Sequence, residues 1–146
     1  MRLLGVDLGD KRTGIALADL LTRIASPVEV VEMPIARNDG ADLLKSLVVV
    51  IERELGPIQS AGEVVLGLPL NMDGSAGPRA KMVQAFGERI AQATGRTVHL
   101  QDERLSSVEA DQRMAQSGLT HGQKKSRRDA IAAAAILRSY MDALAE

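Results

Sequence analysis

Cysteine is absent from the 146 residues of the chain, and aromatic residues are almost absent, with one Phe, one Tyr and no Trp. Without cysteine there can be neither a disulfide nor a thiolate-bound metal, a composition that fits the reducing cytoplasm. No apolar run approaches the ~18 residues that span a membrane, and the first residues resemble a strand rather than a signal peptide. We therefore expect a cytoplasmic protein with no membrane partner and a core of aliphatic side chains.

An excess of charge of one sign is also missing. The chain has 18 basic and 19 acidic residues, a net charge of −1, and 45% of its residues are hydrophobic. The total charge gives no support to a polyanionic partner, so such a partner can be inferred only from how the charges are distributed. The length fits one globular domain, and we find no repeat or linker, so we expect residues 1–146 to form a single domain.

Hydrophobic patterning predicts the element order β-β-β-α-β-α-β-α-α. Strands linked through helices run parallel, so the first, fourth and fifth strands should be parallel, with the second and third antiparallel beside the first. The fold class is therefore α/β: a mixed five-stranded sheet with helices on both faces. The predicted strands are 3–8, 13–18, 26–33, 63–68 and 96–103. The first predicted helix runs from a cap at Asp39 to Leu55, and the second contains Met82, Phe86 and Ile90 and ends at Gly95. Two further helices are predicted over 106–118 and 127–144, with a loop over 119–128.

An acid lies inside the first apolar run, where Asp7 follows Leu3–Val6 and precedes Gly9. A carboxylate without water must be paired, hydrogen-bonded or bound to a metal, because its desolvation costs several kcal/mol or more. The alternative is a structural acid that accepts hydrogen bonds from turn N–H groups beyond Gly9.

Three further acids are expected at the same edge of the sheet. Asp102 and Glu103 end the fifth strand, and the carboxyl ends of parallel strands meet at one edge. Asp129 precedes the apolar stripe Ala133–Ile136–Tyr140 of the last helix by one turn, so it should point toward the sheet.

Oxygen ligands without cysteine suit a hard cation such as Mg²⁺ or Mn²⁺. We therefore expect Asp7, Glu103 and Asp129 to be both the metal ligands and the catalytic residues of a two-metal phosphodiesterase, with Asp7 bridging the ions. Purely structural roles stay open: Glu103 could form an ion pair with Arg104, and Asp129 could cap the last helix in a Ser126-x-x-Asp129 capping box. Asp102 is more easily understood as an acid that supports the ligand residues, or as a surface acid, than as a ligand itself.

Four segments carry a resemblance to a known family. "GVDLGDKRTGIALAD" (5–19), "GLPLNMDGS" (67–75), "QDERLSSVEA" (101–110) and "KKSRRDAIAAAAIL" (124–137) are similar to the signature blocks of the YqgF/RuvX family. The resemblance implies an RNase H-like fold and a nuclease, described either as a Holliday junction resolvase or as an enzyme that matures the precursor of 16S ribosomal RNA. The acids of the family fall on Asp7, Glu103 and Asp129. Arg128 departs from the apolar residue expected before the last acid.

Basic residues gather before the last acid, where Lys124, Lys125 and Arg127 stand in a run without acids. Such a run is usually solvated surface, but beside an acidic site it offers cations to the phosphates of a nucleic acid. With so few aromatic rings, recognition through backbone and shape is favoured over base stacking. The same face should include residues near the first and fifth strands and, from the resemblance, the turn after the fourth: Lys11, Arg12, Arg104 and Asn71.

These observations predict a metal-dependent endonuclease that hydrolyses phosphodiester bonds of structured nucleic acid, with pre-16S rRNA processing favoured narrowly. The alternatives are a Holliday junction resolvase acting on branched DNA and a non-catalytic nucleic-acid-binding module. A kinase- or actin-like phosphotransferase would need a second half that 146 residues cannot hold, so we expect no nucleotide cofactor. The oligomeric state is not fixed by the sequence, and a homodimer stays open.

Overall fold

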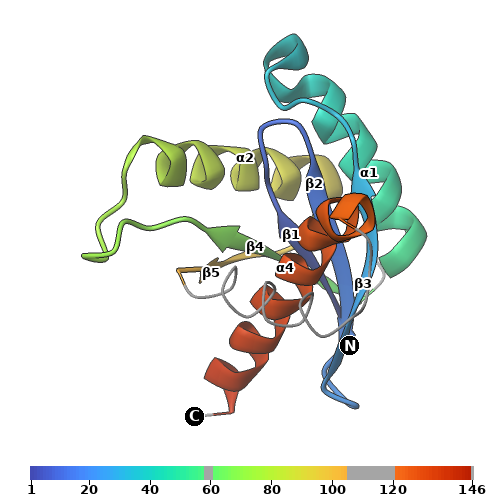
Figure 1. Ribbon diagram of the computed structural model, residues 1–146. Coiled ribbons are helices and arrows are strands. Elements are labelled where there is room, and N and C mark those ends of the chain that lie inside the picture. Colours follow the sequence, from blue (N-terminus) through green and yellow to red (C-terminus); the bar gives the residue numbers. More distant parts are fainter. Residues whose placement is uncertain (58–60, 105–120, 146) are drawn as a thin grey trace.

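A five-stranded sheet in the order β3-β2-β1-β4-β5 forms the centre of the molecule (Figure 1). The computed structural model describes residues 1–57, 61–104 and 121–145, although for 121–127 it describes the backbone alone. The elements are β1 (Arg2–Asp7), β2 (Thr13–Asp19), β3 (Ile24–Val31), the short 3-10 helix η1 (Arg37–Gly40), α1 (Ala41–Leu55), β4 (Glu63–Leu68), α2 (Pro78–Thr94), β5 (Val98–Asp102) and α4 (His121–Leu144).

The strand directions confirm the predicted mixed sheet. β1 is antiparallel to β2, and β2 to β3, whereas β1, β4 and β5 are parallel. β1 and β4, which are neighbours inside the sheet, are buried along most of their length, and this explains their nearly continuous apolar sequences. The carboxyl ends of β1, β4 and β5 therefore lie at one edge of the sheet.

Helices cover both faces of this sheet. α1 and α2 pack on one face, where Leu4, Val6 and Leu66 of the strands meet Leu47 and Phe86 of the helices. α4 alone, among the described elements, packs on the other face, where Ala133 and Leu137 share a core with Leu3, Ala16 and Val65 of the strands. Successive side chains of a strand point to opposite faces of the sheet, so every second residue of β1 faces α4 and the others face α1 and α2.

The predicted start of the last helix is wrong. α4 begins at His121 rather than at residue 127, so the segment from His121 onward is helical and not a loop. Gly122 and Ser126 have lower helix propensity, but good helix formers, Gln123, Lys124 and Lys125, stand between them and extend the helix. The predicted helix over 106–118 lies outside the described residues.

The predicted cap of α1 at Asp39 is also wrong. Gly40 is the N-cap residue, and no side chain caps the helix. Asn38, Asp39 and Gly40 all have positive φ, so the chain enters α1 through a left-handed bend that places glycine at the cap.

β3 begins at Ile24 and ends at Val31, two residues earlier than predicted at each end, because it pairs with β2 up to Asp19. Within the described ranges, no helix has the length and apolarity needed to cross a bilayer.

Candidate active site

Asp7 ends β1 at the carboxyl edge of the sheet. It follows four buried residues and is itself partly buried. It lies on the same face as Gly5, whose missing side chain leaves the space that Leu137 of α4 fills. In the β1–β2 pairing its partner is Gly14. Asp7 therefore points toward the face that α4 covers, next to a position without a side chain.

Glu103 reaches the same place from the end of β5. Its backbone N–H donates to the carbonyl oxygen of Leu68 (3.2 Å), which continues the β4–β5 pairing by one residue. Its carboxylate fills the space over Gly67, since a Cβ at Gly67 would lie 2.3 Å from the Oε2 atom of Glu103. The carboxylates of Glu103 and Asp7 lie close enough for each to shift the pKa of the other. Glycine in β4 thus makes room for this carboxylate pair.

Asp129 belongs to α4, the helix that covers the face of the sheet toward which Asp7 points. A Cβ at Gly14 would lie 1.9 Å from the backbone carbonyl oxygen of Asp129, so the helix lies directly against β2 beside Asp7. The capping-box alternative is wrong, because α4 begins at His121 and Asp129 lies eight residues further along the helix. The sequence prediction that Asp129 belongs to the sheet-facing side of the helix fits this close packing.

The three acids influence one another electrostatically. Burial, followed by the charge of Glu103 and its hydrogen bond, raises the pKa of Asp7 well above its usual range, and the charge of Asp129 raises it further. Burial also raises the pKa of Glu103 and of Asp129. Asp7 is thus the acid whose pKa is raised by the charges of both others.

Two arginines face these acids. The Arg12 Nε atom lies 3.6 Å from Asp129 Oδ2, and the charge of Arg12 lowers the pKa of Asp129 against the effect of burial. Arg79, in the first turn of α2, lowers the pKa of both Asp7 and Glu103. Sequence reasoning placed Arg12 near the site but missed Arg79. A signal was present, because a cation in the first turn of a helix opposes the helix dipole and so indicates a role outside the helix.

The remaining predicted residues are distributed around this edge. Arg104 forms an ion pair with Asp102 (2.7 Å) rather than with Glu103 and donates to the carbonyl oxygen of Met72 (3.0 Å), so the Glu103–Arg104 alternative is wrong. Asp102 is thereby a surface acid with a lowered pKa, as expected, because Arg104 donates a hydrogen bond to it. Asn71 donates to the Ser75 hydroxyl (3.0 Å) within the loop after β4.

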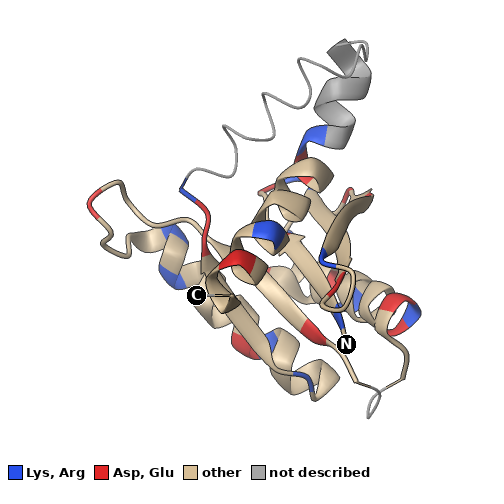
Figure 2. Cartoon of the chain, turned by 90° about the horizontal axis from the view of Figure 1, so that it is seen from below, with Lys and Arg blue, Asp and Glu red and all other residues tan. Residues whose placement is uncertain are grey.

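The basic run is placed only through its backbone. Residues 124–127 belong to α4, and their side chains are not among the described ones; most of the third signature segment also lies outside the described residues. Lys11 is exposed in the turn after Asp7. Figure 2 shows Lys and Arg interspersed with Asp and Glu over the described elements, in agreement with the balanced net charge. Binding of these cations to nucleic acid stays a prediction.

The donor set at this edge suits a hard cation, because it consists of carboxylate oxygens alone. Within the described part of the chain, no three His, Cys, Asp or Glu side chains form a ready-made set of ion ligands. Asp7 and Glu103 lie close enough to shift each other's pKa, and Asp129 lies beside Arg12. The residues present therefore fit a divalent cation in kind.

Comparison with known proteins identifies the family. A family model described as "RuvX: Holliday junction resolvase" matches residues 1–143. The chain belongs to the RuvX family. A relative from Anaeromyxobacter sp. (strain Fw109-5) is 45% identical over 142 residues, which cover 97% of each chain, and one from Myxococcus xanthus is 39% identical over 98% of this chain and 89% of its own; both are named "Putative pre-16S rRNA nuclease".

The fold of this RuvX-family chain is shared with resolvases of known structure. Thermus thermophilus RuvC, solved in complex with a Holliday junction, superposes with a TM-score of 0.57 at 15% identity over 98% of this chain and 94% of the other. The fowlpox virus resolvase, solved with Holliday junction DNA, also gives 0.57, at 14% identity and full coverage of both chains. These similarities confirm the predicted RNase H-like fold.

Proposed function

We propose that the chain is a metal-dependent endonuclease that hydrolyses phosphodiester bonds in structured nucleic acid. The observation that carries this proposal is the placement of three acids at the carboxyl edge of the sheet: Asp7 ends β1, the carboxylate of Glu103 lies over Gly67, and Asp129 lies against Gly14, the partner of Asp7 in β2. Carboxylates crowded in this way repel each other unless a proton or a cation lies between them. Membership of the RuvX family, with relatives named as nucleases, supports the same reaction class.

In this proposal Asp7, Glu103 and Asp129 hold the divalent cation, Mg²⁺ or Mn²⁺. A bound pair of such ions supplies an activated water and stabilises the leaving oxygen in phosphodiester hydrolysis. The protein contributes the alignment: β1 and β5 bring two acids side by side, and α4 brings the third. Arg12, which lies beside Asp129, would be placed to bind a phosphate of the substrate.

We favour precursor 16S rRNA as the substrate, in the cytoplasm, because the relatives with 35–45% identity carry that name. The family description favours branched DNA as a second candidate. The two differ in a physical requirement. A four-way junction is resolved by two cuts, so DNA resolution would need two copies of this site, as a homodimer supplies, whereas trimming an RNA end needs one.

The decisive experiment compares purified wild type with Asp7→Asn on a precursor rRNA fragment and on a four-way DNA junction, with and without Mg²⁺. We expect Mg²⁺-dependent cleavage by the wild type and a loss of several orders of magnitude in Asp7→Asn. Asp142→Asn is the matched control, because Asp142 lies on the same helix as Asp129 but is exposed far from the acids. Binding of either substrate without cleavage would contradict the proposal and favour a non-catalytic module.

A further inference from the structure

Arg79 reaches from the start of α2 to the backbone that follows Asp7. Its Nη1 atom donates to the Asp10 carboxylate (2.6 Å), and its Nη2 atom donates to the carbonyl oxygen of Leu8 (2.9 Å). Leu8 is the residue directly after Asp7. One guanidinium group thus fixes the chain next to the acid at two points that lie 69 and 71 residues away in the sequence.

The turn that Arg79 contacts is built tightly. A Cβ at Gly9 would lie 2.2 Å from the carbonyl oxygen of Arg12, so the turn closes on itself at glycine. Asp10 also accepts a backbone hydrogen bond, from the N–H of Ile35 (3.0 Å). The turn ends at Arg12, which faces Asp129. The position of this turn therefore determines where Asp7 lies at its start and where Arg12 lies at its end.

A stabilising ion pair does not account for Arg79. The Arg79 side chain is 41% exposed and that of Asp10 79% exposed, and such surface pairs contribute little to stability. Its place in the first turn of α2 is unfavourable for the helix dipole. Its charge is felt by both Asp7 and Glu103, so the guanidinium lies within electrostatic reach of the acid pair.

We propose that Arg79 is a positioning residue of the nuclease site: it holds the turn 8–12 on α2 and thereby keeps Asp7 facing Glu103, in the arrangement that receives a divalent cation. The inference rests on the proposed function. It assigns to α2 a part in a site whose three acids all come from other elements.

The test uses four variants of the whole chain: Arg79→Gln, Arg79→Lys, Asp10→Asn and the control Arg89→Gln. Arg89 is a matched control because it stands on the same helix and also donates to a loop carbonyl, that of Asp39 (2.7 Å), away from the acids. For each variant we would measure the rise of Tm with Mg²⁺ concentration, which reports cation binding without catalysis, and kcat on the substrate that the wild type cleaves.

We expect Arg79→Gln to raise the half-saturating Mg²⁺ concentration and to lower kcat by about tenfold to a hundredfold, the range found when residues that orient metal ligands are replaced. Arg79→Lys should recover part of the Mg²⁺ affinity and part of kcat, since lysine keeps one hydrogen-bond donor. Asp10→Asn should lower the Mg²⁺ affinity and kcat less than Arg79→Gln does, because Arg79 still donates to the carbonyl oxygen of Leu8. Arg89→Gln should lower Tm at most and leave the Mg²⁺ response unchanged.

Three outcomes would overturn the inference. If Arg79→Gln matches Arg89→Gln in its Mg²⁺ response, Arg79 is a purely structural residue. If Arg79→Gln binds Mg²⁺ more tightly than the wild type, its charge alone matters, because removing a nearby cation relieves repulsion of the ion. If Arg79→Gln does not fold, Asp10→Asn and Arg79→Lys take its place in the test. A Mg²⁺ response in both that equals that of the wild type would show that Arg79 is a purely structural residue. A wild type without any Mg²⁺ response would instead contradict the proposed function itself.

Discussion

At the scale of single residues, two glycines make room for the candidate site, Gly14 for the backbone of Asp129 and Gly67 for the carboxylate of Glu103. Asp7 was predicted from an acid inside an apolar strand, and Asp129 from its place one turn before an apolar stripe. Gly14 and Gly67 carry no such signal, because their role depends on α4 and Glu103, which approach from distant parts of the chain. Arg79 was missed although its place in the first turn of α2 is a signal, because its partners Leu8 and Asp10 lie far away in the sequence, after β1.

Gly67→Ala tests whether the missing side chain is needed for the acid pair. The new Cβ would lie 2.3 Å from Glu103 Oε2 and 2.5 Å from Ile136 Cδ1, so both side chains must move. We expect a strong loss of cleavage together with destabilisation of about 1–3 kcal/mol, the usual cost of overpacking. Gly87→Ala is the matched control: its nearest neighbour would be Leu66 Cδ2 at 3.2 Å, and activity should be kept.

The acid pair predicts how stability varies with pH in metal-free protein. Burial raises the pKa of Asp7 in the folded state, so between its unfolded value of ~3.9 and the raised value the folded chain binds more protons than the unfolded chain. The contribution of Asp7 is therefore favourable below pH ~4 and is lost as the pH rises through this window. Urea unfolding across pH 4–8 should show Asp7→Asn gaining stability relative to wild type as the pH rises; a constant difference would contradict the shift.

At the scale of elements, hydrophobic patterns predicted all five strands, their directions and α1, α2 and α4. The ends of helices were predicted less well, because they depend on tertiary packing rather than periodicity. The left-handed bend before Gly40 and the six added residues at the start of α4 are examples. Pairing with β2 likewise decided the bounds of β3, which the alternation of apolar and polar residues had placed two residues too late.

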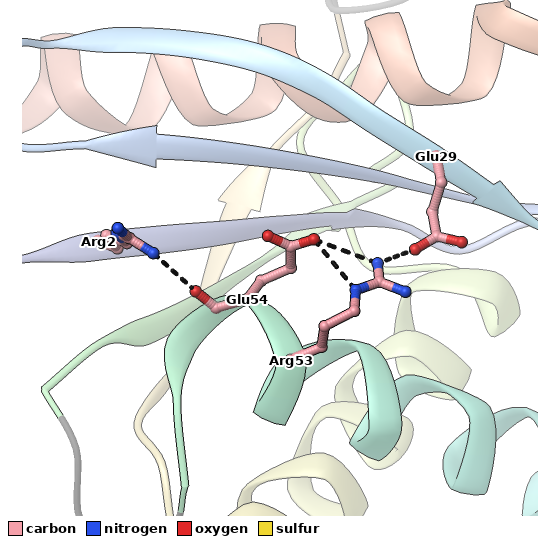
Figure 3. A network of polar contacts seen from close by, with 4 residues as sticks. All are labelled: Arg2, Glu29, Arg53 and Glu54. Atoms are coloured by element: carbon pink, nitrogen blue, oxygen red, sulfur yellow. Dashed lines mark hydrogen bonds and ion pairs between the residues drawn. The ribbon is translucent and has the colours of Figure 1, made fainter.

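A charged network links the edge strand β3 to α1 (Figure 3). Arg53 of α1 contacts the carboxylates of Glu29 and Glu54, and Arg2 of β1 donates to the Glu54 carbonyl oxygen (3.2 Å). These side chains are partly or largely exposed, so salt and water weaken their attraction. We expect Glu29→Gln to lower the free energy of unfolding by less than ~1 kcal/mol, with the difference vanishing in 1 M salt. A decrease of several kcal/mol in chemical denaturation would show that this network is part of the core.

At the scale of the whole molecule, the net charge of −1 means that a polyanion must be bound by a local concentration of cations. The run that includes Lys124 and Lys125 leads along α4 to Asp129. Replacing both lysines with alanine should weaken binding of many sequences about equally and flatten the plot of log affinity against log salt by roughly one unit for each phosphate that is no longer bound. Cleavage at saturating substrate should change far less than in Asp7→Asn. Unchanged affinity and an unchanged salt slope would show that Lys124 and Lys125 do not bind phosphates. The binding face would then be expected near Lys11, Arg12 and Arg104.

The central claim is that Asp7, Glu103 and Asp129 form one divalent-cation site. Titration of the protein with Mn²⁺, followed by the electron paramagnetic resonance signal of the free ion, measures this directly and needs no substrate. We expect the wild type and the control Asp142→Asn to bind Mn²⁺ alike, while Asp7→Asn, Glu103→Gln and Asp129→Asn each bind at least about tenfold more weakly. Equal Mn²⁺ binding by the wild type and Asp7→Asn would contradict the claim.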